Sequence, residues 1–329
     1  MKDHENRDAP RRVDEDAASP ARLPAAPELI VVGYEDRLVA DHQALLEAAR
    51  AEGFRAELVD PSRITVSVGG DATAVLVDGV ARTPAVALPR GVNRPWPFVR
   101  QVLDVWAGFG TRVVPDVAAA DLCADKLATA RVLAEHGVGV LPTLGVLPGA
   151  GVTIDGAPAH PGDDPVLVTK PARASKGEGV RAGSPVETRV DLRRRFPLAD
   201  GVVDHQIVQP RASDWGVDHR VVVAGGEVVA MTRRHGAPGA LTTNTRGATV
   251  VDVDDPWSEA PEVAAVAVAA CGALGLEFGG IDVIVHQGRA VVLEANAWPG
   301  LAAHVRGTTI ARALVRRAAR VTEPRVALG

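Results

Sequence analysis

The stretch "GGIDVIVHQGRAVVLEANAWPG", Gly279–Gly300, constrains the fold more than any other part of this chain. Two β-type runs flank the turn residues Gln287–Gly288 and predict a hairpin. If the turn centres on Gly288, Asp282 and Glu294 lie opposite each other, with Cβ atoms roughly 5 Å apart. Asn296, two residues beyond Glu294, lies on the same face of the sheet.

Two carboxylates this close repel each other and are costly to desolvate. A hard divalent cation removes the conflict, and Mg²⁺ commonly joins one or two carboxylates to substrate phosphates. The hairpin therefore predicts a metal–phosphate site at Asp282, Glu294 and Asn296. The alternative, a solvated hairpin face with scattered acids, stays open on this feature alone.

Composition excludes several other classes of protein. The chain has 329 residues and a net charge of −5, and this negative charge argues against broad electrostatic binding to nucleic acid. Its two cysteines, Cys123 and Cys271, lack the spacing of a zinc site or a disulfide framework. We see no signal-peptide core and no apolar run of about 18 residues, so the expected location is the cytoplasm, without membrane attachment.

Hydrophobic periodicity predicts the organisation of the chain. Residues 1–27 lack any period and are predicted to be a disordered leader. Alternating strands and helices over residues 28–113 predict a small α/β domain, beginning with a strand at Glu28–Gly33 and a helix within Asp36–Gly53. Further single helices are expected at about Trp96 to Gly108, Ala118–Val138 and Pro256–Leu276.

A second set of candidate residues is "TKPARASKGEGV". Lys170 ends an apolar strand, and the small residues of Ser175–Gly179 follow it. Such a loop can fold over phosphates and offer backbone N–H donors while the lysine neutralises their charge. Neither a Walker A motif nor a G-x-G-x-x-G fingerprint is present, and Gly-containing turns after strands are common.

A third set is "DHRVVVAGGEVVAMTRRHGAPGALTTNTRGA". Asp218 and Arg220 open a strand, "AGGE" predicts a tight turn, and Arg233 with Arg234 ends the return strand. Guanidinium groups near a metal–phosphate site suit bidentate binding of phosphate or carboxylate. The alternative is an exposed edge with solvated arginines. Lys126, alone on an amphipathic helix, carries no hypothesis of its own.

Together these stretches resemble the ATP-grasp superfamily, most closely its branch of amino-acid ligases that includes the ribosomal-protein S6 glutamate ligase and LysX-type enzymes. The similarity covers roughly Val113–Gly307, in the family's order: "DKLATARVLAEHGVGVLPT", "VLVTKPARASKGEGV", "IVQPRASDWGVDHRVVVAGGEVVAMTRR", "TNTRGA" and "GGIDVIVHQGRAVVLEANAWPGL". It implies an α/β (α+β) fold, with the N-terminal domain (28–113) followed by two α+β lobes, 114–200 and 201–329, that enclose the nucleotide.

The resemblance also implies roles for individual residues. Residues expected to bind ATP through side chain or backbone are Lys126, Lys170, Ser175, Gly177, Gly179, Gln209, Pro210, Arg211 and Asp218. Asp282, Glu294 and Asn296 match ligands of two Mg²⁺ ions, with Mn²⁺ as an alternative. Basic positions near the transferred phosphate and acyl group are Arg220, Arg233 and Arg246. Residues expected to contact the other substrates are Arg90, Arg94, Asn244 and Arg306.

Two positions depart from the family pattern. Thr242 stands where the glutamate ligases commonly have an arginine, and Trp298 fills a position that is usually small. Both changes bear on the identity of the amine rather than on the ATP chemistry. "PRGVNRPW", with Arg90 and Arg94, resembles the family's loop for the carboxylate substrate.

The implied activity is ATP-dependent joining of a carboxylate to an amine through an acylphosphate, releasing ADP and phosphate. The amine is expected to be an amino acid, the acid a small molecule, a peptide or a carrier protein, and the enzyme a homo-oligomer. Two alternatives belong to other classes: a non-catalytic ATP-binding module and a small-molecule kinase. A panel of acids and amines, with mass analysis of the product, separates the three.

Overall fold

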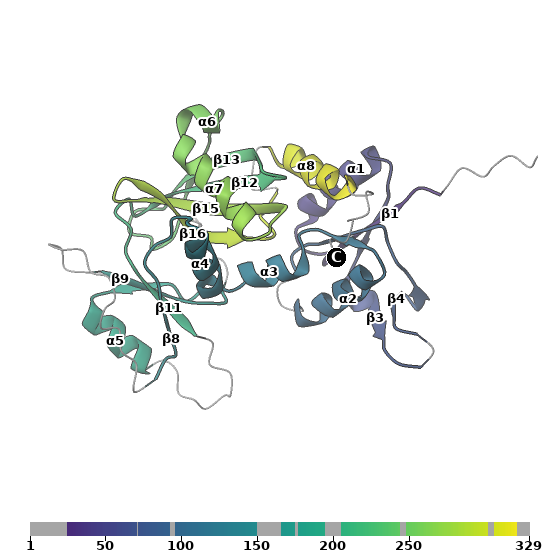
Figure 1. The fold of residues 1–329 in the computed structure, drawn as a ribbon, viewed down its shortest axis with the longest axis horizontal. Coiled ribbons are helices and arrows are strands. Elements are labelled where there is room, and N and C mark those ends of the chain that lie inside the picture. Colours follow the sequence, from purple (N-terminus) through teal and green to yellow (C-terminus); the bar gives the residue numbers. More distant parts are fainter. Residues whose placement is uncertain are drawn as a thin grey trace, which may run out of the picture.

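The computed structural model describes residues 25–70, 72–92, 96–149, 166–174, 177–194, 205–243, 248–301 and 306–320 (Figure 1). Nearly all of the predicted leader lies outside these residues. So do four of the predicted site residues: Arg94, Ser175, Asn244 and Arg246. The predicted α/β class is confirmed, with helices and several sheets. No helix in the described ranges is long and apolar enough to cross a membrane.

The N-terminal part contains a parallel sheet in the order β2-β1-β6-β7. Its strands are β1 (Glu28–Val32), β2 (Arg55–Val59), β6 (Val86–Pro89) and β7 (Arg112–Val113), and its helices are α1 (Val39–Ala51) and α2 (Trp96–Gly108). A short 3₁₀ helix, η1 (Pro61–Arg63), precedes a small antiparallel sheet of β3 (Ile64–Ser67), β4 (Ala74–Val77) and β5 (Val80–Ala81). The predicted first strand and first two helices are confirmed.

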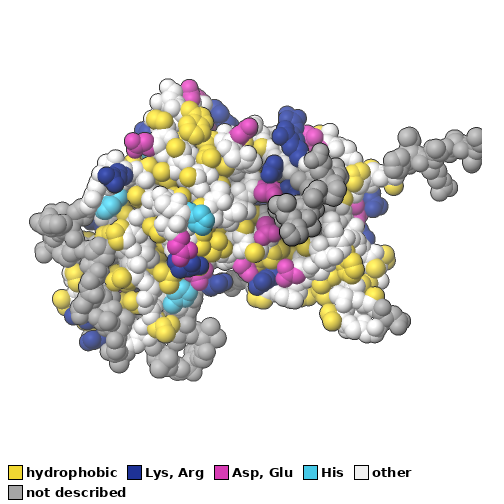
Figure 2. Space-filling model, viewed as in Figure 1, with side chains coloured by type: hydrophobic (Ala, Val, Ile, Leu, Met, Phe, Trp, Pro, Cys, Tyr) yellow, Lys and Arg dark blue, Asp and Glu magenta, His cyan; other side chains and the backbone are white. Residues whose placement is uncertain are grey.

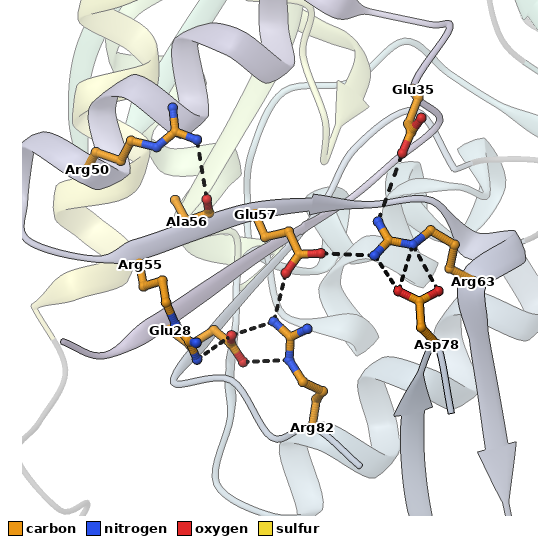
Figure 3. Close-up of polar contacts among 9 residues, drawn as sticks. All are labelled: Glu28, Glu35, Arg50, Arg55, Ala56, Glu57, Arg63, Asp78 and Arg82. Carbon is orange, nitrogen blue, oxygen red and sulfur yellow. Dashed lines mark hydrogen bonds and ion pairs between the residues drawn. The ribbon is translucent and has the colours of Figure 1, made fainter. Parts of the chain in front are cut away.

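The outer strand of the parallel sheet carries charge. Figure 3 shows Glu57 of β2 paired with Arg63 and Arg82, and Arg82 also paired with Glu28 of β1. Arg63 in turn forms an ion pair with Asp78, 2.5 Å away. Charged side chains of this kind discourage another strand from pairing with an exposed edge. On the face drawn in Figure 2, basic and acidic side chains are interspersed among the described residues, as a small net charge suggests.

The middle of the chain forms an antiparallel sheet in the order β10-β9-β11-β8. Its elements are β8 (Leu144–Val146), β9 (Leu167–Pro171), β10 (Arg181–Gly183), β11 (Gln206–Pro210) and α5 (Pro185–Arg194), a helix that the sequence reading did not anticipate. Its core is small, with Leu167, Leu192 and Val208 buried together. In Figure 1 this part forms the lower left of the molecule.

The largest sheet has five antiparallel strands in the order β14-β13-β12-β15-β16. They are β12 (Val217–Ala224), β13 (Glu227–His235), β14 (Thr249–Asp252), β15 (Phe278–His286) and β16 (Arg289–Asn296). One face packs on α7 (Pro261–Ala273), using residues such as Val221 and Ile281. The other face places Val222 and Phe278 against β1, α1 and α8 (Gly307–Ala319), a helix that the sequence reading also did not anticipate.

Two predicted helices are each divided in the structure. Ala118–Val138 contains α3 (Val117–Cys123) and α4 (Lys126–Glu135), because Asp125 adopts an extended conformation and caps α4 by accepting hydrogen bonds from Leu127 N and Ala128 N. Pro256–Leu276 contains α6 (Pro256–Glu259) and α7, because Pro261 has no N–H to donate and restricts the preceding residue. The first break places Lys126 at the start of a helix, directed at the site.

Candidate functional site

The β15–β16 hairpin brings the predicted metal ligands together through a β-bulge. Gln287 and Gly288 both have positive φ, 53° and 74°, as a tight two-residue hairpin turn requires. Counted from that turn alone, Asp282 would lie opposite Leu293. The register shifts by one residue between Asp282 and Val283, so Asp282 lies opposite Glu294, as expected, and Asn296 lies opposite Gly280.

A chain of charges crosses the sheet from Asp282. Arg220 of β12 donates to both carboxylate oxygens of Asp282, and Nη2 of Arg234 on β13 lies 3.0 Å from Oδ2. Arg234 also donates to both oxygens of Asp218, at 2.7 and 2.6 Å, and Thr243 Oγ1 donates to Oδ2 at 2.6 Å. Burial raises the pKa of Asp282, but the two guanidinium groups outweigh burial and hold that pKa below its usual range.

Two lysines approach the carboxylates from the middle of the chain. Lys126 Nζ donates to the carbonyl of Ala174 at 2.5 Å and lies 3.5 Å from Oε1 of Glu294. Lys170, on β9, is buried; burial is the largest effect on its pKa and lowers it to about 8, with Lys126 acting in the same direction and Glu294 opposing it. The two ammonium groups therefore lie beside the hairpin carboxylates, where they can neutralise phosphates.

A cavity lies between the middle sheet and the five-stranded sheet. Many of its lining residues are predicted site residues: Lys126, Lys170, Gly177, Gln209, Pro210, Asp218, Asp282 and Glu294. Apolar side chains, including Leu141, Ile284 and Leu293, line it as well. Gln209 is fixed by a 2.9 Å hydrogen bond from its amide to Thr143 Oγ1. An elongated ligand with an apolar ring system and an anionic end suits this lining.

The other predicted residues that the structure describes lie outside the cavity lining. Gly179 has a φ of 72°, and a Cβ there would lie 2.8 Å from Pro171, so the loop needs glycine at this point. Arg211 is exposed. Arg306 pairs with Asp254 at 2.6 Å on the surface. Arg90 is buried and paired with Asp41, whose Oδ2 also accepts from Leu301 N at 3.1 Å.

The structure places Arg234, not Arg233, on the face that carries the site. Arg233 donates to His219 Nε2 at 3.1 Å on the opposite face of the sheet. Counted from the turn at Gly225–Gly226, Asp218 would face Arg233, but a register shift between Val222 and Val223 pairs Asp218 with Arg234. Sequence reasoning named Arg234 beside Arg233 but gave a role near the transferred phosphate only to Arg233, and it missed Thr243. Recognition of this bulge would have favoured Arg234 over Arg233.

The hairpin residues fit a magnesium ion. Asp282 and Glu294 lie directly opposite each other, and the side chain of Asn296, on the same face, has a buried amide nitrogen without a hydrogen-bond partner in the described part of the chain. Two carboxylates and one amide are a hard oxygen-donor set. A bound cation would share Asp282 with Arg220 and Arg234, or replace one of them.

Comparison with known proteins agrees with this geometry. Residues 163–317 match the model of the RimK-like ATP-grasp domain. A probable alpha-L-glutamate ligase of Klebsiella pneumoniae is 30% identical over 78% of this chain and 83% of its own length. The chain belongs to the RimK-like ATP-grasp family. A second probable alpha-L-glutamate ligase, from Thioalkalivibrio sulfidiphilus, is 29% identical over 83% of this chain and 88% of its own.

The fold of this RimK-like chain is also that of solved ATP-grasp ligases. The ATP-grasp ligase PsnB, in complex with a minimal precursor, Mg and ADP, superposes with a TM-score of 0.60 at 20% identity, covering 88% of this chain and 97% of PsnB. The protein is accordingly an ATP-dependent ligase that forms carbon–nitrogen bonds. The resemblance inferred from the ordered motifs is confirmed.

Proposed function

We propose that this ligase joins a carboxylate to the amino group of an amino acid through an acylphosphate, with release of ADP and phosphate. The observation that carries the proposal is the meeting of Lys126 and Lys170 with Asp282 and Glu294 in the lining of one cavity. Positive and negative groups side by side suit a bound metal–phosphate group. The names of the curated relatives make glutamate the first amine to test.

Each group in the site would have a defined task. In the first step a carboxylate oxygen attacks the γ-phosphorus and the bond to the β-phosphate oxygen breaks. Lys126 and Lys170 would neutralise the phosphates, and Arg220 would stabilise charge that develops on the transferred group. Asp282, Glu294 and Asn296 would hold Mg²⁺, which polarises phosphoryl oxygens when bound. Gln209, Pro210 and Asp218 would line the nucleoside end, with Asp218 held by Arg234 and Thr243.

The second step forms the amide. The amine nitrogen attacks the acyl carbon, the carbon–oxygen bond to phosphate breaks, and the nitrogen loses a proton. No side-chain nucleophile is needed for either step. The protein would contribute orientation, charge neutralisation and exclusion of water from the acylphosphate. The acid is proposed to be a small molecule, a peptide or a carrier-protein side chain.

The test measures ADP release over a matrix of carboxylic acids and amino acids, beginning with glutamate, with Mg²⁺ and ATP present. Hydroxylamine serves as a surrogate amine, because it converts an acylphosphate to a stable hydroxamate. Mass spectrometry of the product distinguishes an amide from a phosphate ester. A phosphate ester, or no release of ADP with any pair, would contradict the proposal.

The metal assignment has its own variant. Glu294→Gln keeps the size of the side chain and removes its charge, and we expect ADP release to fall at least about 100-fold. Glu227→Gln, at an exposed turn of β13, is the matched control and should keep full activity. Full turnover by Glu294→Gln would remove that residue from the metal site.

A further inference from the structure

The segment Ala297–Leu301 forms a wall beside the charged side chains of the site, which run from Asp282 through Arg220 and Arg234 to Asp218. Gly280, opposite Asn296, has no side chain, and a Cβ there would lie 2.6 Å from Cβ of Pro299 and 3.3 Å from Cδ of Arg220. The ring of Pro299 and the aliphatic part of the Arg220 side chain therefore both lie over Gly280. Since Arg220 pairs with Asp282, Pro299 lies on the face where phosphoryl transfer is proposed.

The far end of this segment is attached to the N-terminal domain. Leu301 N–H donates to Oδ2 of Asp41 at 3.1 Å, and Asp41 is also paired with Arg90. Asp41 and Arg90 are each only 2% exposed, and Leu301 is fully buried. A segment tied to the sheet at Pro299 and to α1 at Leu301 has little freedom to rearrange. Its side chains are held in fixed positions.

Trp298 of this segment contacts Trp96, the first residue of α2. The ring centroids are 4.8 Å apart and the planes meet at 64°, an edge-to-face pair. The two indole N–H groups differ in their partners. Trp96 donates to Asp121, which also pairs with Arg100 at 2.7 Å. The N–H of Trp298 is buried and has no acceptor among the described residues.

A second donor without a partner lies two residues earlier, the buried amide nitrogen of Asn296. The large majority of buried side-chain polar atoms in native proteins have a partner, and leaving a donor unpaired is costly. Both groups donate hydrogen bonds, so both require an acceptor such as a carbonyl or carboxylate oxygen. A ligand that supplies oxygen at this wall would remove the cost at both positions.

Among the described residues, Glu294 lines the proposed nucleotide cavity, whereas Asn296 and Trp298 lie beyond its lining. In phosphoryl transfer the attacking and leaving oxygens lie roughly in line, so the attacking acid approaches from the side opposite ADP. The chain runs away from the cavity and towards the N-terminal domain as it passes from Glu294 through Asn296 to Trp298. The acid is the substrate expected on that side.

We propose, on the basis of the proposed function, that Trp298 is a specificity-determining residue that donates its indole N–H to an oxygen of the carboxylate substrate. The acid it selects carries an oxygen acceptor, a carbonyl or a second carboxylate, close to the reacting carboxyl group. Trp96, which donates to Asp121, contacts the ring of Trp298 edge-to-face, a contact that phenylalanine at position 96 can keep. The proposal thus assigns Trp298 to the acid and not to the amine, the substrate that the family resemblance had connected with this position.

Two matched substitutions test the proposal. Trp298→Phe removes an N–H without an internal partner, and Trp96→Phe removes one that Asp121 accepts. With hydroxylamine as the amine, we expect Trp298→Phe to raise KM for the acid about tenfold and leave KM for ATP within about twofold. We expect Trp96→Phe to leave KM for the acid unchanged.

The melting temperature, Tm, of the substrate-free variants is a second measurement, and it does not depend on turnover. Trp298→Phe should leave Tm unchanged or raise it, whereas Trp96→Phe should lower it by about 2–4 °C. An unchanged KM for the acid in Trp298→Phe, or a fall in Tm equal to that of Trp96→Phe, would overturn the proposal. Failure of the unmodified chain to turn over any acid would instead contradict the proposed function.

Discussion

Lys170 shows at the scale of one residue how the site trades stability for binding. Its side chain is buried, and burial lowers its pKa from 10.5 to about 8. Glu294 and Asp282 oppose that shift without cancelling it. The folded, ligand-free protein therefore holds a charged ammonium group at a cost. An anionic ligand in the cavity would offset this cost on binding.

Replacement of Lys170 by methionine should stabilise the ligand-free protein at pH 7. The folded pKa lies below the unfolded one, so the unfolded state binds more protons between about pH 8 and 10.5. The gain in unfolding free energy, on the order of 3 kcal/mol, is fully present below pH 8 and disappears as pH rises above 10.5. Urea unfolding at pH 7 and at pH 10.5 measures it.

The same Lys170→Met variant should lose most of its affinity for ATP, because its side chain no longer neutralises phosphate. Calorimetric titration with Mg²⁺ and ATP measures this loss. Lys126→Met is a useful comparison, since that lysine is less buried and makes ion-pair contact with Glu294. Unchanged ATP affinity in Lys170→Met would remove Lys170 from the nucleotide site.

At the scale of elements, two β-bulges decide which side chains enter the site. The β12–β13 bulge pairs Asp218 with Arg234, and the β15–β16 bulge pairs Asp282 with Glu294. An extra residue in one strand reverses the faces of all residues beyond it. Both bulges lie between the hairpin turn and the charged residues, so each acts on the half of the hairpin that forms the site.

The close contact above Gly280 gives an element-scale prediction. Gly280→Ala should push Pro299 away, destabilise the fold by about 1–3 kcal/mol and reduce kcat by displacing the Ala297–Leu301 segment. Gly272→Ala in α7 is the matched control, because that glycine is exposed and a Cβ there meets nothing within 4 Å. The control should gain about 0.5–1 kcal/mol from lower backbone entropy in the unfolded chain.

Urea unfolding and steady-state kinetics of the two alanine variants check this prediction. Equal effects of both substitutions on stability and on kcat would show that the position of Pro299 does not require a glycine at position 280.

At the scale of the whole molecule, the cavity lies between parts with very different cores. One large cluster joins β1 and α1 to β12, β15 and α8, and an ion pair between Arg112 and Glu277 adds to it. In the described part of the middle sheet, the apolar cluster beneath α5 contains three buried residues, Leu167, Leu192 and Val208. Few buried apolar contacts mean a low local free energy of opening. The N-terminal domain and five-stranded sheet should therefore be the rigid support, and the middle sheet the part that adjusts to nucleotide.

Amide hydrogen exchange tests this difference. In the ligand-free protein, amides of β9 and β11 should exchange faster than those of β12 and β15. Addition of Mg²⁺ and ATP should slow exchange chiefly in β9 and β11, which carry Lys170 and Gln209. Equal protection of both sheets before nucleotide is added would contradict the prediction.

The sequence by itself determined the family and most of the chemistry. The order of motifs, the lysines, the paired carboxylates and the hairpin turns follow from residue types and local turn preferences. It also predicted α2 with its bounds. The single helices expected at Ala118–Val138 and Pro256–Leu276 were wrong, although Asp125 and Pro261 are known boundary signals that could have been given more weight.

Only the tertiary structure decided which side chains of the strands face the site. The pairing of Asp282 with Glu294 was expected from a turn centred on Gly288, but the turn lies half a residue earlier and a bulge restores the pairing. The same device replaces Arg233 by Arg234 opposite Asp218. A bulge depends on how neighbouring strands pair and how both faces of the sheet pack. That information is distributed over distant residues, so counting from a local turn cannot supply it.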